Sequence, residues 1–442
     1  MPDNKTLYNT AFKIIQKLQN NGYETFIVGG SVRDKLLGYQ VKDIDIVTSA
    51  QPHIINELFK KTYNIGAAFG IVNIIENKYS FEVATFRKES DYEDGRHPTK
   101  IEYTESPELD AMRRDFTINA LYYDPINNKI IDFHNGIDDI KKGILRTIGP
   151  AEKRFKEDYL RILRAIRFSL RFDIKIDQEI LEVIPNLANS LNKLSKERVR
   201  DELCKIFTGP APDKAFQLLY DTGIMDAILP ELSNLKGVTQ PKAYHPEGDV
   251  FEHTKIMLSK MAMPSLELAW AILLHDIGKP DTLEIGSNGI ERFYFHANHG
   301  KNIAKKILIK YKLPKKTIDR VSYAVKNHMR FGVVHEMRVS KYIALMAEPT
   351  FPLELELHRI DCLSSHMNVE NFIFLIDKLI EQKGETKLPP PLITGNDLIK
   401  LGLKPGPIFN KLLNNIRVKQ IEKSINTKKE AIRTVKELIQ HI

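Results

Sequence analysis

Cysteine is scarce in this chain: only Cys204 and Cys362 occur among its 442 residues. Two cysteines cannot build the disulfide framework of a small secreted protein, which favours a reducing compartment. No apolar run approaches the roughly 20 residues that cross a bilayer. The first residues also lack the apolar core of a signal peptide and are typical of an amphipathic helix. We therefore expect a cytoplasmic protein with no membrane partner.

Internal repeats and low-complexity tracts are absent as well, and the composition is that of an ordinary soluble protein. Charged residues make up 28% and hydrophobic residues 42% of the chain, which excludes an intrinsically disordered protein. The length is sufficient for roughly two to four domains, each able to bury a core. The net charge of +8 favours a polyanionic partner, although many basic proteins bind no nucleic acid.

The periodicity of apolar residues separates a mixed region from a helical region. Short apolar runs bounded by turn residues predict strands over residues 24–30, 42–47, 71–76, 79–86 and 128–133. From about residue 151 onward the pattern is helical, with breaks at 210–212, 237–249 and 388–397. We therefore expect an α/β head over residues 1–150, followed by helical modules over 151–240, 241–385 and 386–442.

One short segment carries two features that together predict a nucleotide site. A predicted strand runs into Gly29 and Gly30, with Arg33 close behind; glycines let backbone N–H groups approach a phosphate, and arginine adds a charged fork. Asp43 and Asp45 alternate with two isoleucines, which places both carboxylates on one face of a strand. Adjacent carboxylates repel unless a cation such as Mg²⁺ lies between them. Each feature alone is more often a turn or a solvated strand face; together they favour metal-assisted chemistry on a nucleotide.

A later helix is predicted to have one apolar and one charged stripe. The apolar stripe consists of Leu160, Leu163, Ile166 and Leu170. Asp158, Arg161, Arg164 and Arg167 recur at intervals of three along the other. A solvated face with one Asp158–Arg161 pair explains two of these residues but leaves Arg164 and Arg167 without a counter-charge, so an anionic ligand is the alternative.

Histidines gather in the third quarter of the chain, where nine of the thirteen fall between residues 245 and 366. The adjacent pair His275 and Asp276 follows the apolar run LELAWAILL. Burying two polar groups on an apolar helix is costly unless something coordinates them. Imidazole with carboxylate suits Mn, Fe, Ni or Zn better than Mg, although a lone buried histidine is more often a satisfied core residue.

The opening segment resembles the class II nucleotidyltransferase family, which contains the CCA-adding tRNA nucleotidyltransferases and the bacterial poly(A) polymerases. The matching residues are Gly29, Gly30, Val32, Arg33, Asp34, Leu37, Gly38, Asp43 and Asp45. The resemblance implies a polymerase-β-like head, a small mixed sheet with helices, followed by all-α modules. It also implies that Mg²⁺ on Asp43 and Asp45 holds the triphosphate and helps to activate the attacking 3′-hydroxyl. Glu82, on a neighbouring predicted strand, is as well explained by a cross-strand pair and is not included.

Residues 109–120 resemble a second segment of this family, in which Arg-Arg-Asp meets the ribose and phosphates of the nucleotide. This implies nucleotide binding by Arg114, with Asp115 beside it. In isolation, a salt bridge at a helix end explains the same residues.

Residues 157–168 closely resemble the amino-acid template of the family. The resemblance implies that Asp158 and Arg161 hydrogen-bond the base of CTP or ATP, which fits an acceptor beside a donor. Arg164 and Arg167 would support the template or bind phosphate. Residues 195–202 resemble a segment that supports this helix, although a capped surface helix explains them equally well.

The polar run at residues 87–100 has almost nothing to bury and is predicted to be a mobile loop. Family members that add only CC have lost a flexible loop after the sheet strands. The residues that match the retained form are Asp91, Asp94, Gly95, Arg96 and Pro98. The resemblance therefore implies an enzyme that adds the terminal A.

The histidine-rich region resembles the HD phosphohydrolase domain. The resemblance implies a transition-metal site whose ligands are His253, His275, Asp276 and Asp361, with His299 and His328 matching additional histidines of some members. Lys279 would touch phosphate. Whether such a site catalyses hydrolysis or serves structure or binding stays open. The last residues, around 392–407, resemble the C-terminal segment of many family members and are expected to pack as a small helical module.

We therefore predict template-independent addition of CCA to tRNA 3′ ends from CTP and ATP. The domains would be a nucleotidyltransferase head over 1–150, a helical neck and RNA-binding body over 151–240, an HD domain over 241–385 and a helical tail over 386–442. An enzyme that adds only A and a poly(A) polymerase are the near alternatives. An HD phosphohydrolase with a nucleotide-sensing head is the alternative of another class. The sequence does not predict the oligomeric state.

Overall fold

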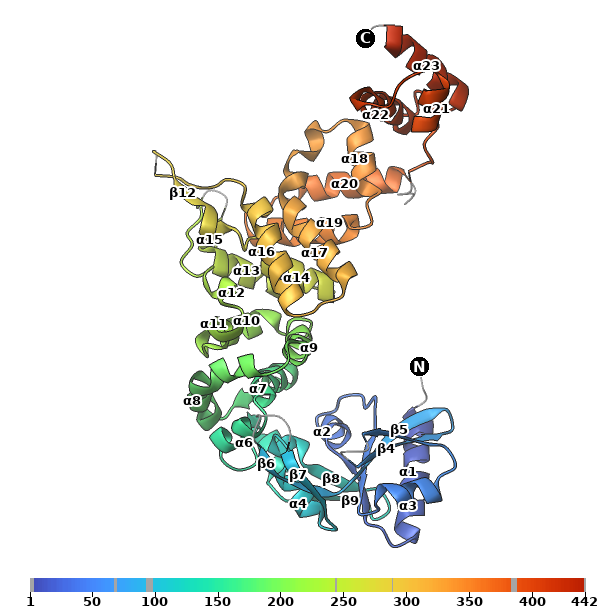
Figure 1. Cartoon of the computed structure of the whole chain (residues 1–442). Helices are drawn as coiled ribbons and strands as arrows, with labels where there is room; N and C mark the ends of the chain where they lie inside the picture. Colours follow the sequence, from blue (N-terminus) through green and yellow to red (C-terminus); the bar gives the residue numbers. More distant parts are fainter. Residues whose placement is uncertain are drawn as a thin grey trace. The chain divides into compact units, whose positions relative to one another are not determined.

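A seven-stranded mixed sheet forms the centre of the head (Figure 1). The computed structural model of the chain describes residues 4–66, 70–92, 98–242, 245–287, 289–382 and 388–440. The chain divides into two compact units, residues 1–233 and 234–442. The strands of the sheet are β1 (Thr25–Val28), β2 (Asp45–Thr48), β3 (Thr62–Gly66), β4 (Ile71–Glu76), β5 (Tyr79–Thr85), β8 (Leu121–Asp124) and β9 (Lys129–Asp132).

The strand order β3-β4-β5-β2-β1-β8-β9 places β1 and β2 near the middle of the sheet. β1 pairs antiparallel with β2 and β8, whereas β2 pairs parallel with β5. The register sets Asp45, the first residue of β2, opposite Val28, the last residue of β1. The Gly29–Gly30 turn follows directly, so the carboxylate of Asp45 begins beside the glycines.

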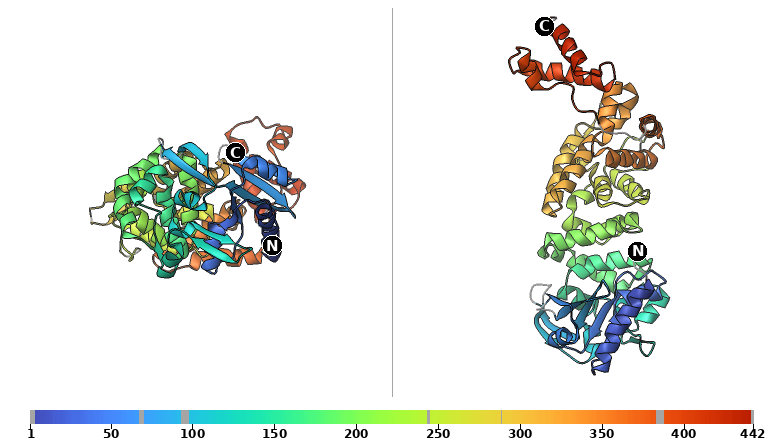
Figure 2. Two further views of the ribbon diagram at one scale, coloured as in Figure 1. Left: turned by 90° about the horizontal axis from the view of Figure 1, so that it is seen from below. Right: turned by 90° about the vertical axis from the view of Figure 1, so that its right-hand side faces the viewer.

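Alternating apolar side chains give the sheet two buried faces. Ile27, Ile46 and Val83 pack with α1 (Asn4–Asn20) and α3 (Pro52–Leu58) on one face. Phe26, Val28 and Val47 face the other way. α1 lies along the sheet in each view (Figures 1 and 2). The remaining helices of the head are α2 (Gly30–Leu36), α4 (Pro107–Met112), the 3₁₀ helix η2 (Thr117–Asn119) and α5 (Gly136–Lys142).

The two aspartates of the opening segment lie differently from the prediction. β2 begins at Asp45, so Asp43 precedes the strand. The predicted alternation still holds, because Ile44 and Ile46 are buried while Asp43 and Asp45 are exposed. The strand is shorter than predicted since the residues before it have no partner strand.

The prediction of a mobile loop at residues 87–100 is wrong for those of its residues that the structure describes. β6 (Arg87–Tyr92) pairs with β7 (Pro98–Tyr103) in an antiparallel ribbon. Two charged residues of β6 are paired with each other: Arg87 is buried and its Nε donates to Glu89 at 2.7 Å. Asp91 and Pro98 belong to this ribbon, whereas Asp94, Gly95 and Arg96 lie outside the described residues.

Helices make up most of the rest of the first unit, as predicted. They are α6 (Ala151–Glu157), α7 (Leu160–Phe172), α8 (Gln178–Leu187), η3 (Ala188–Lys193), α9 (Lys196–Phe207), α10 (Pro212–Asp221), α11 (Ile224–Ile228) and α12 (Pro230–Ser233). A short parallel pair of strands, β10 (Ile144–Leu145) and β11 (Lys175–Ile176), was not predicted. Leu160, Leu163 and Ile166 of α7 are buried as expected, whereas Leu170 is only partly buried.

The second unit is helical, with one short hairpin that the periodicity did not reveal, β12 (Leu283–Ile285) and β13 (Glu291–Phe293). Its helices are α13 (Val250–Ser259), α14 (Leu266–Leu274), α15 (Lys279–Thr282), α16 (His296–Lys310), α17 (Lys315–Asn327), η4 (His328–Glu336), α18 (Val339–Met346), α19 (Phe351–Ser364), α20 (Glu370–Glu381), α21 (Gly395–Lys400), α22 (Pro407–Ile421) and α23 (Lys428–Gln440). None of the described helices could span a membrane by length and apolarity.

Candidate active sites

A polar cavity of about 480 Å³ lies between the head and α7, inside the first unit. Head and neck side chains line it together. From the head come Gly29, Gly30, Arg33, Asp45, Arg113, Arg114, Asp115 and Asn119; from the neck come Asp158, Leu160, Arg161, Arg164, Arg167, Phe168, Arg171 and Arg198. Of the residues predicted for this site, Asp43 alone is outside the lining, in the exposed position before β2. The structure therefore gathers the predicted nucleotide-binding residues around one cavity.

Asp45 is one of three aspartates that line this cavity, with Asp115 and Asp158. Desolvation raises its pKa, and the carboxylates of Glu82 and Asp43 raise it further. Arg114 and Arg33 oppose that shift. A cation beside Asp43 and Asp45 would relieve the mutual repulsion, and an all-oxygen donor set suits Mg²⁺. The residues present therefore fit the metal that the sequence predicted.

The turn between β1 and α2 requires glycine at its first position. Gly29 has φ 68°, a left-handed conformation that side chains disfavour. A Cβ there would also lie 3.4 Å from Nη1 of Arg114. Because glycine has no side chain, the backbone at this position can adopt a positive φ and lie close to the Arg114 guanidinium.

Arg33 is buried and already partnered. Its guanidinium donates to Asp34 at 2.8 and 2.6 Å and to the amide oxygen of Asn119. It also lies over the rings of Phe168 and Phe172, 5.0 and 4.5 Å from their centroids. Arg33 is therefore a fixed positive wall of the cavity, held from both the head and α7.

Arg114 has the salt bridge that the sequence left open as an alternative, and it lines the cavity as well. Its Nη2 donates to Asp110 at 3.0 Å and its Nε donates to the hydroxyl of Tyr122 at 3.2 Å. Asp110 is fully buried, and although burial opposes it, the two neighbouring arginines hold the pKa of its carboxyl well below the usual range.

The charge pattern predicted for α7 is partly wrong. Asp158 does not belong to the helix: it has φ −149° and ψ 104°, between α6 and α7. Its carboxylate accepts from Arg198 of α9 at 2.8 Å, not from Arg161. Arg161 instead donates to Glu157 at 2.7 Å. The predicted Asp158–Arg161 pair required both residues to be one turn apart on the same helix. It does not form because Asp158 is extended.

The pattern within the helix offered no counter-charge for Arg164 and Arg167, but the fold supplies one for each. Arg164 donates to Asp115 at 2.8 and 2.5 Å, and Arg167 donates to Glu202 at 2.6 Å. Both partners come from other elements, so a pattern within one helix could not reveal them. Glu202 belongs to α9, which packs against α7, so residues 195–202 contact the helix that they were expected to support.

Several lining residues were missed, among them Asn119, Phe168 and Arg198. Each lies in one of the three segments that resemble the family (109–120, 157–168 and 195–202). None was among the residues predicted from those segments to bind the nucleotide. Asn119 matters most, because its Nδ2 donates to Asp115 at 2.9 Å while its Oδ1 accepts from Arg33.

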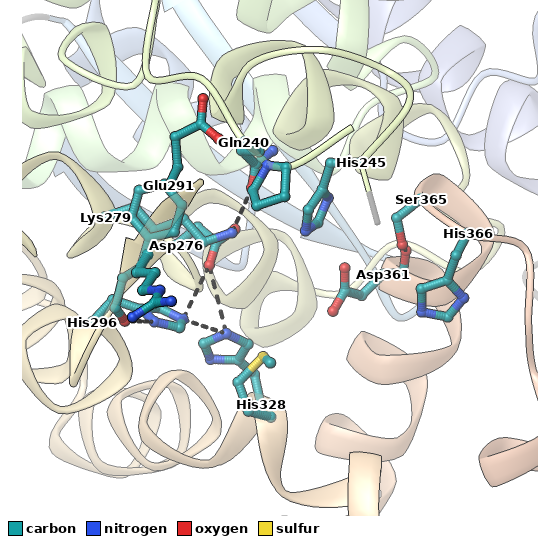
Figure 3. Close-up of a pocket in the computed structure, with 14 residues that line it drawn as sticks. Gln240, His245, Asp276, Lys279, Glu291, His296, His328, Asp361, Ser365 and His366 are labelled. Carbon is teal, nitrogen blue, oxygen red and sulfur yellow. Dashed lines mark hydrogen bonds and ion pairs between the residues drawn. The ribbon is translucent and has the colours of Figure 1, made fainter. Parts of the chain in front are cut away.

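A second cavity, of about 400 Å³, lies in the second unit, and its lining includes His245, His296, His328, Asp276 and Asp361 (Figure 3). His253 comes from α13, His275 and Asp276 follow α14, and Asp361 comes from α19. These three helices pack against one another. His253 Nε2 lies 3.1 Å from Asp361 Oδ1, and His275 Nε2 lies 3.1 Å from Asp276 Oδ2. The four predicted ligands are therefore brought together.

The ring nitrogens of this cluster are set up to bind a cation. His253 Nδ1 lies 2.7 Å from Glu247, and His275 Nδ1 lies 2.8 Å from the carbonyl of Ile272. Both Nε2 atoms are buried and lie 3.1 Å from a carboxylate oxygen, but the contacts are not well-aligned hydrogen bonds. Burial disfavours a charged ring, yet the carboxylates of Asp361 and Glu247 raise the pKa of His253 to about 9. Two buried ring nitrogens that face carboxylates fit a transition metal, which would take the place of the proton.

His299 does not join the cluster. Its Nε2 lies 2.7 Å from Asp281, and the side chain is 45% exposed. His296, one turn earlier on α16, lies near Asp276 together with His328. The helix begins at His296, directly after Phe295 in a left-handed conformation with φ 61°. The sequence did not show where this helix starts, and so it selected the wrong histidine.

Lys279 lies beside Asp276, as expected for a residue near the metal ligands. Its Nζ is 2.6 Å from Asp276 Oδ2 and also contacts Gln240. Arg292 lines the same cavity. Two cations beside a carboxylate–histidine cluster can accommodate a phosphate group.

Models of known families match most of the chain. Residues 25–146 match "Poly A polymerase head domain", and residues 173–236 match "Probable RNA and SrmB- binding site of polymerase A". Residues 249–365 match "HD domain", and residues 359–435 match a model described as tRNA nucleotidyltransferase domain 2. The head and HD resemblances stated from the sequence are thereby confirmed. The four-part division at residues 150, 240 and 385 stays a prediction.

Curated relatives of this chain include CCA-adding enzymes from several bacteria. The CCA-adding enzyme of Leuconostoc mesenteroides is 30% identical over 406 residues, which cover 91% of this chain and 89% of that enzyme. The CCA-adding enzyme of Lactobacillus johnsonii is 39% identical over 262 residues, 59% of this chain. The match spans 65% of the length of that enzyme, and 59% of the length of the Lactobacillus helveticus enzyme.

Solved structures show the same fold over nearly the whole chain. The crystal structure of Bacillus stearothermophilus CCA-adding enzyme in complex with CTP superposes with a TM-score of 0.71 at 25% identity. The match covers 98% of this chain and 99% of that one. The Thermotoga maritima CCA-adding enzyme complexed with tRNA_CCA has a TM-score of 0.58 at 20% identity, over 97% of this chain and 94% of that one. The predicted fold class, an α/β head followed by helices, is confirmed.

Proposed function

Since the chain belongs to the family of CCA-adding enzymes, we propose that it adds C, C and A to the 3′ end of tRNA. CTP and ATP would be the nucleotide substrates, and no nucleic-acid template would be needed. The observation that carries this proposal is the shared cavity of the first unit, where Asp45 and Arg114 of the head face Asp158 and Arg161 of the neck. With tRNA, CTP and ATP as substrates, the protein would work in the cytoplasm.

In this proposal Asp43 and Asp45 would hold Mg²⁺, which would supply charge neutralisation at the triphosphate and at the attacking 3′-hydroxyl. Arg33 and Arg114 would face the phosphates and ribose, since both line the cavity with their guanidinium groups held by neighbouring side chains. Gly30 would allow the backbone to approach a phosphate. Positioning and charge are what nucleotidyl transfer requires from the protein.

Asp158 and Arg161 would select the base. Asp158 supplies only acceptors and Arg161 supplies only donors, so a pyrimidine or an adenine edge can match the pair after small rotations. Arg161 Nη2 now donates to the carbonyl of Arg113 at 2.9 Å, and Nη1 donates to Glu157. A base would replace one of these hydrogen bonds. Arg164 and Arg167, each held by a carboxylate, would support the template.

The second cavity favours an accessory activity, hydrolysis of a phosphate ester. The observation behind it is the pair of buried Nε2 atoms of His253 and His275, which make no well-aligned hydrogen bond in the described structure and face carboxylates. A transition metal on His253, His275, Asp276 and Asp361 would activate water there. Lys279 would contact the phosphate.

One assay separates these functions. Purified protein is offered tRNA transcripts ending at the discriminator base, at C or at CC, with CTP and ATP separately and together. Incorporation of both nucleotides that stops after A supports the proposal. A added only to transcripts ending in CC indicates an A-adding enzyme, and long A tracts indicate a poly(A) polymerase; either result contradicts CCA addition.

A pair of variants tests the separation of the two sites. Asp43→Ala with Asp45→Ala should abolish nucleotide transfer and leave metal-dependent phosphatase activity unchanged, whereas His275→Ala should do the reverse. Loss of both activities in either folded variant would contradict two independent sites.

A further inference from the structure

Asp110, on α4, is a fully buried carboxylate that does not line the nucleotide cavity. Its Oδ1 accepts a hydrogen bond from Nε of Arg113 at 2.9 Å. Its Oδ2 accepts from Nη2 of Arg114 at 3.0 Å and from the hydroxyl of Tyr122 at 2.7 Å. Both arginines line the cavity, so one carboxylate outside the cavity holds two of the cations inside it.

Tyr122 closes this set of contacts. Its hydroxyl donates to Asp110 and accepts from Nε of Arg114 at 3.2 Å, as one hydrogen and two lone pairs allow. The tyrosine is fully buried on β8, an internal strand of the sheet. Nε and Nη2 of Arg114 are therefore both engaged, which fixes the plane of the guanidinium.

The third nitrogen of this guanidinium, Nη1, is left for a ligand. It has no hydrogen-bond partner among the residues that the structure describes, and it lies 3.4 Å from the position of a Cβ added to Gly29. β8 also supports the glycine turn, because Tyr122 pairs with Val28 of β1. The N–H of Gly29 donates to the carbonyl of Leu121 at 3.1 Å. The turn and Nη1 thus belong to one rigid frame.

We propose that Asp110 and Tyr122 are positioning residues for the nucleotide, which hold Arg114 with Nη1 directed at the phosphate and ribose side of the cavity. Neither residue would touch the nucleotide; both would act through the arginine. Without them the long arginine side chain would have to be ordered when the nucleotide binds, at a cost in affinity. Asp110 also offsets the repulsion between the adjacent guanidinium groups of Arg113 and Arg114. The inference rests on the proposed nucleotidyl transfer and extends it to two residues outside the cavity.

A purely structural role is the alternative, since a buried carboxylate requires donors wherever it lies. The two roles predict different losses. A structural defect lowers the stability of the head and weakens the binding of every substrate, whereas a positioning defect weakens the binding of CTP and ATP and spares tRNA. Tyr122→Phe separates the two, because the ring keeps its edge contacts with Phe26 and Phe133 when the hydroxyl is removed.

The test measures the binding of CTP and ATP to the full-length protein by calorimetry, without tRNA, so that no transfer occurs. We expect Kd to rise about 3–10-fold in Tyr122→Phe and at least about tenfold in Asp110→Asn. In transfer assays, kcat at saturating nucleotide should stay within about twofold of the wild-type value, and KM for tRNA should not change. Tyr123→Phe is the matched control: Tyr123 is the next residue of β8, and its hydroxyl donates to Asn128 at 2.9 Å. This variant should bind both nucleotides with the wild-type Kd.

A double-mutant cycle shows whether Tyr122 acts through Arg114. Arg114→Ala should weaken nucleotide binding, and the addition of Tyr122→Phe should weaken it by less than about twofold more. The full loss in both backgrounds overturns the inference, as does an unchanged Kd in Tyr122→Phe or an equal rise in KM for tRNA. Wild-type protein that binds CTP and ATP without adding CCA contradicts the proposed function but leaves the positioning role in place. Wild-type protein that binds neither nucleotide overturns both.

Discussion

Asp115 accepts two hydrogen bonds from Arg164, one from Nε at 2.8 Å and one from Nη2 at 2.5 Å. The other oxygen of Asp115 accepts from Asn119, which in turn accepts from Arg33. A continuous chain of polar side chains thus links the phosphate side of the cavity to the helix proposed to read the base. Burial alone would raise the pKa of Asp115. The Arg164 guanidinium stabilises the charged carboxylate, so that pKa lies well below its usual range.

Removing Asp115 should disturb both stability and transfer. Asp115→Ala leaves Arg164 and Asn119 without their shared acceptor, and we expect a loss of about 2–3 kcal/mol in the free energy of unfolding. Transfer efficiency, kcat/KM, should fall at least about tenfold for both CTP and ATP. Denaturant unfolding and steady-state kinetics measure the two effects.

An exposed ion pair provides the control for that variant. Glu437 pairs with Arg433 on α23, with side chains 56% and 83% exposed, so Glu437→Ala should cost less than about 0.5 kcal/mol. Equal losses in the two variants would contradict a structural role for Asp115.

Asp158 and Arg161, which we propose select the base, should affect nucleotide selectivity more than the rate of transfer. With Asp158→Ala we expect misincorporation of UTP or GTP relative to CTP and ATP to rise about 10–100-fold, because a directional acceptor is lost. Competition assays with labelled nucleotides measure the ratio. Asp201→Ala removes a more exposed aspartate of α9 and should leave selectivity unchanged; increased misincorporation in Asp201→Ala, or unchanged misincorporation in Asp158→Ala, argues against the assignment.

Gly29 allows a comparison between backbone strain and crowding. Gly29→Ala and Gly22→Ala both place a side chain at positive φ, 68° and 86°, at a cost of about 1 kcal/mol each. Only Gly29 has a guanidinium 3.4 Å from the added Cβ, whereas nothing lies within 4 Å at Gly22. We therefore expect KM for the nucleotides to rise about tenfold in Gly29→Ala alone. If KM for the nucleotides is the same in both variants, backbone strain accounts for the effect of Gly29→Ala and contact with Arg114 does not.

Glu354 predicts a pH dependence of stability in the second unit. Burial raises its pKa to about 7 from 4.5, although Arg330 opposes the shift. The neutral form is therefore favoured in the folded protein, and its contribution is fully present below about pH 4.5 and lost as pH rises through 7. The amplitude is up to about 3 kcal/mol.

Glu354→Gln should flatten this dependence, because the amide cannot ionise. Thermal unfolding between pH 5 and 8 measures the slope, with Glu381→Gln as the control, since Glu381 is 57% exposed. If wild type and Glu354→Gln lose stability in parallel over this range, another group causes the change.

Sequence patterns with a local period predicted the structure well. Ile44 and Ile46 are buried, and Asp43 and Asp45, which alternate with them, are exposed, because alternation is a property of neighbouring residues. The packing of Leu160, Leu163 and Ile166 follows from helical spacing in the same way. The charge partners of α7 did not follow, since Asp115 and Glu202 lie 49 and 35 residues from the arginines they contact. Only the tertiary fold brings such residues together.

The choice between His296 and His299 shows a different limit. Both residues lie on α16, and which one faces Asp276 depends on where the helix begins and how it is rotated. The start is set by the left-handed backbone of Phe295, a conformation that is unusual for a bulky residue. No composition or spacing rule indicates it.

The register that sets Asp45 opposite Val28 places the acidic group on a rigid central strand, while Asp158 and Arg161 stand at the start of a helix. In the proposed function, the reaction and the choice of nucleotide would therefore depend on separate parts of the chain whose side chains line one cavity. Under that proposal, a substitution in α6 or α7 would alter which nucleotide is accepted without altering β2, which carries Asp45. One catalytic centre could then acquire new substrate preferences.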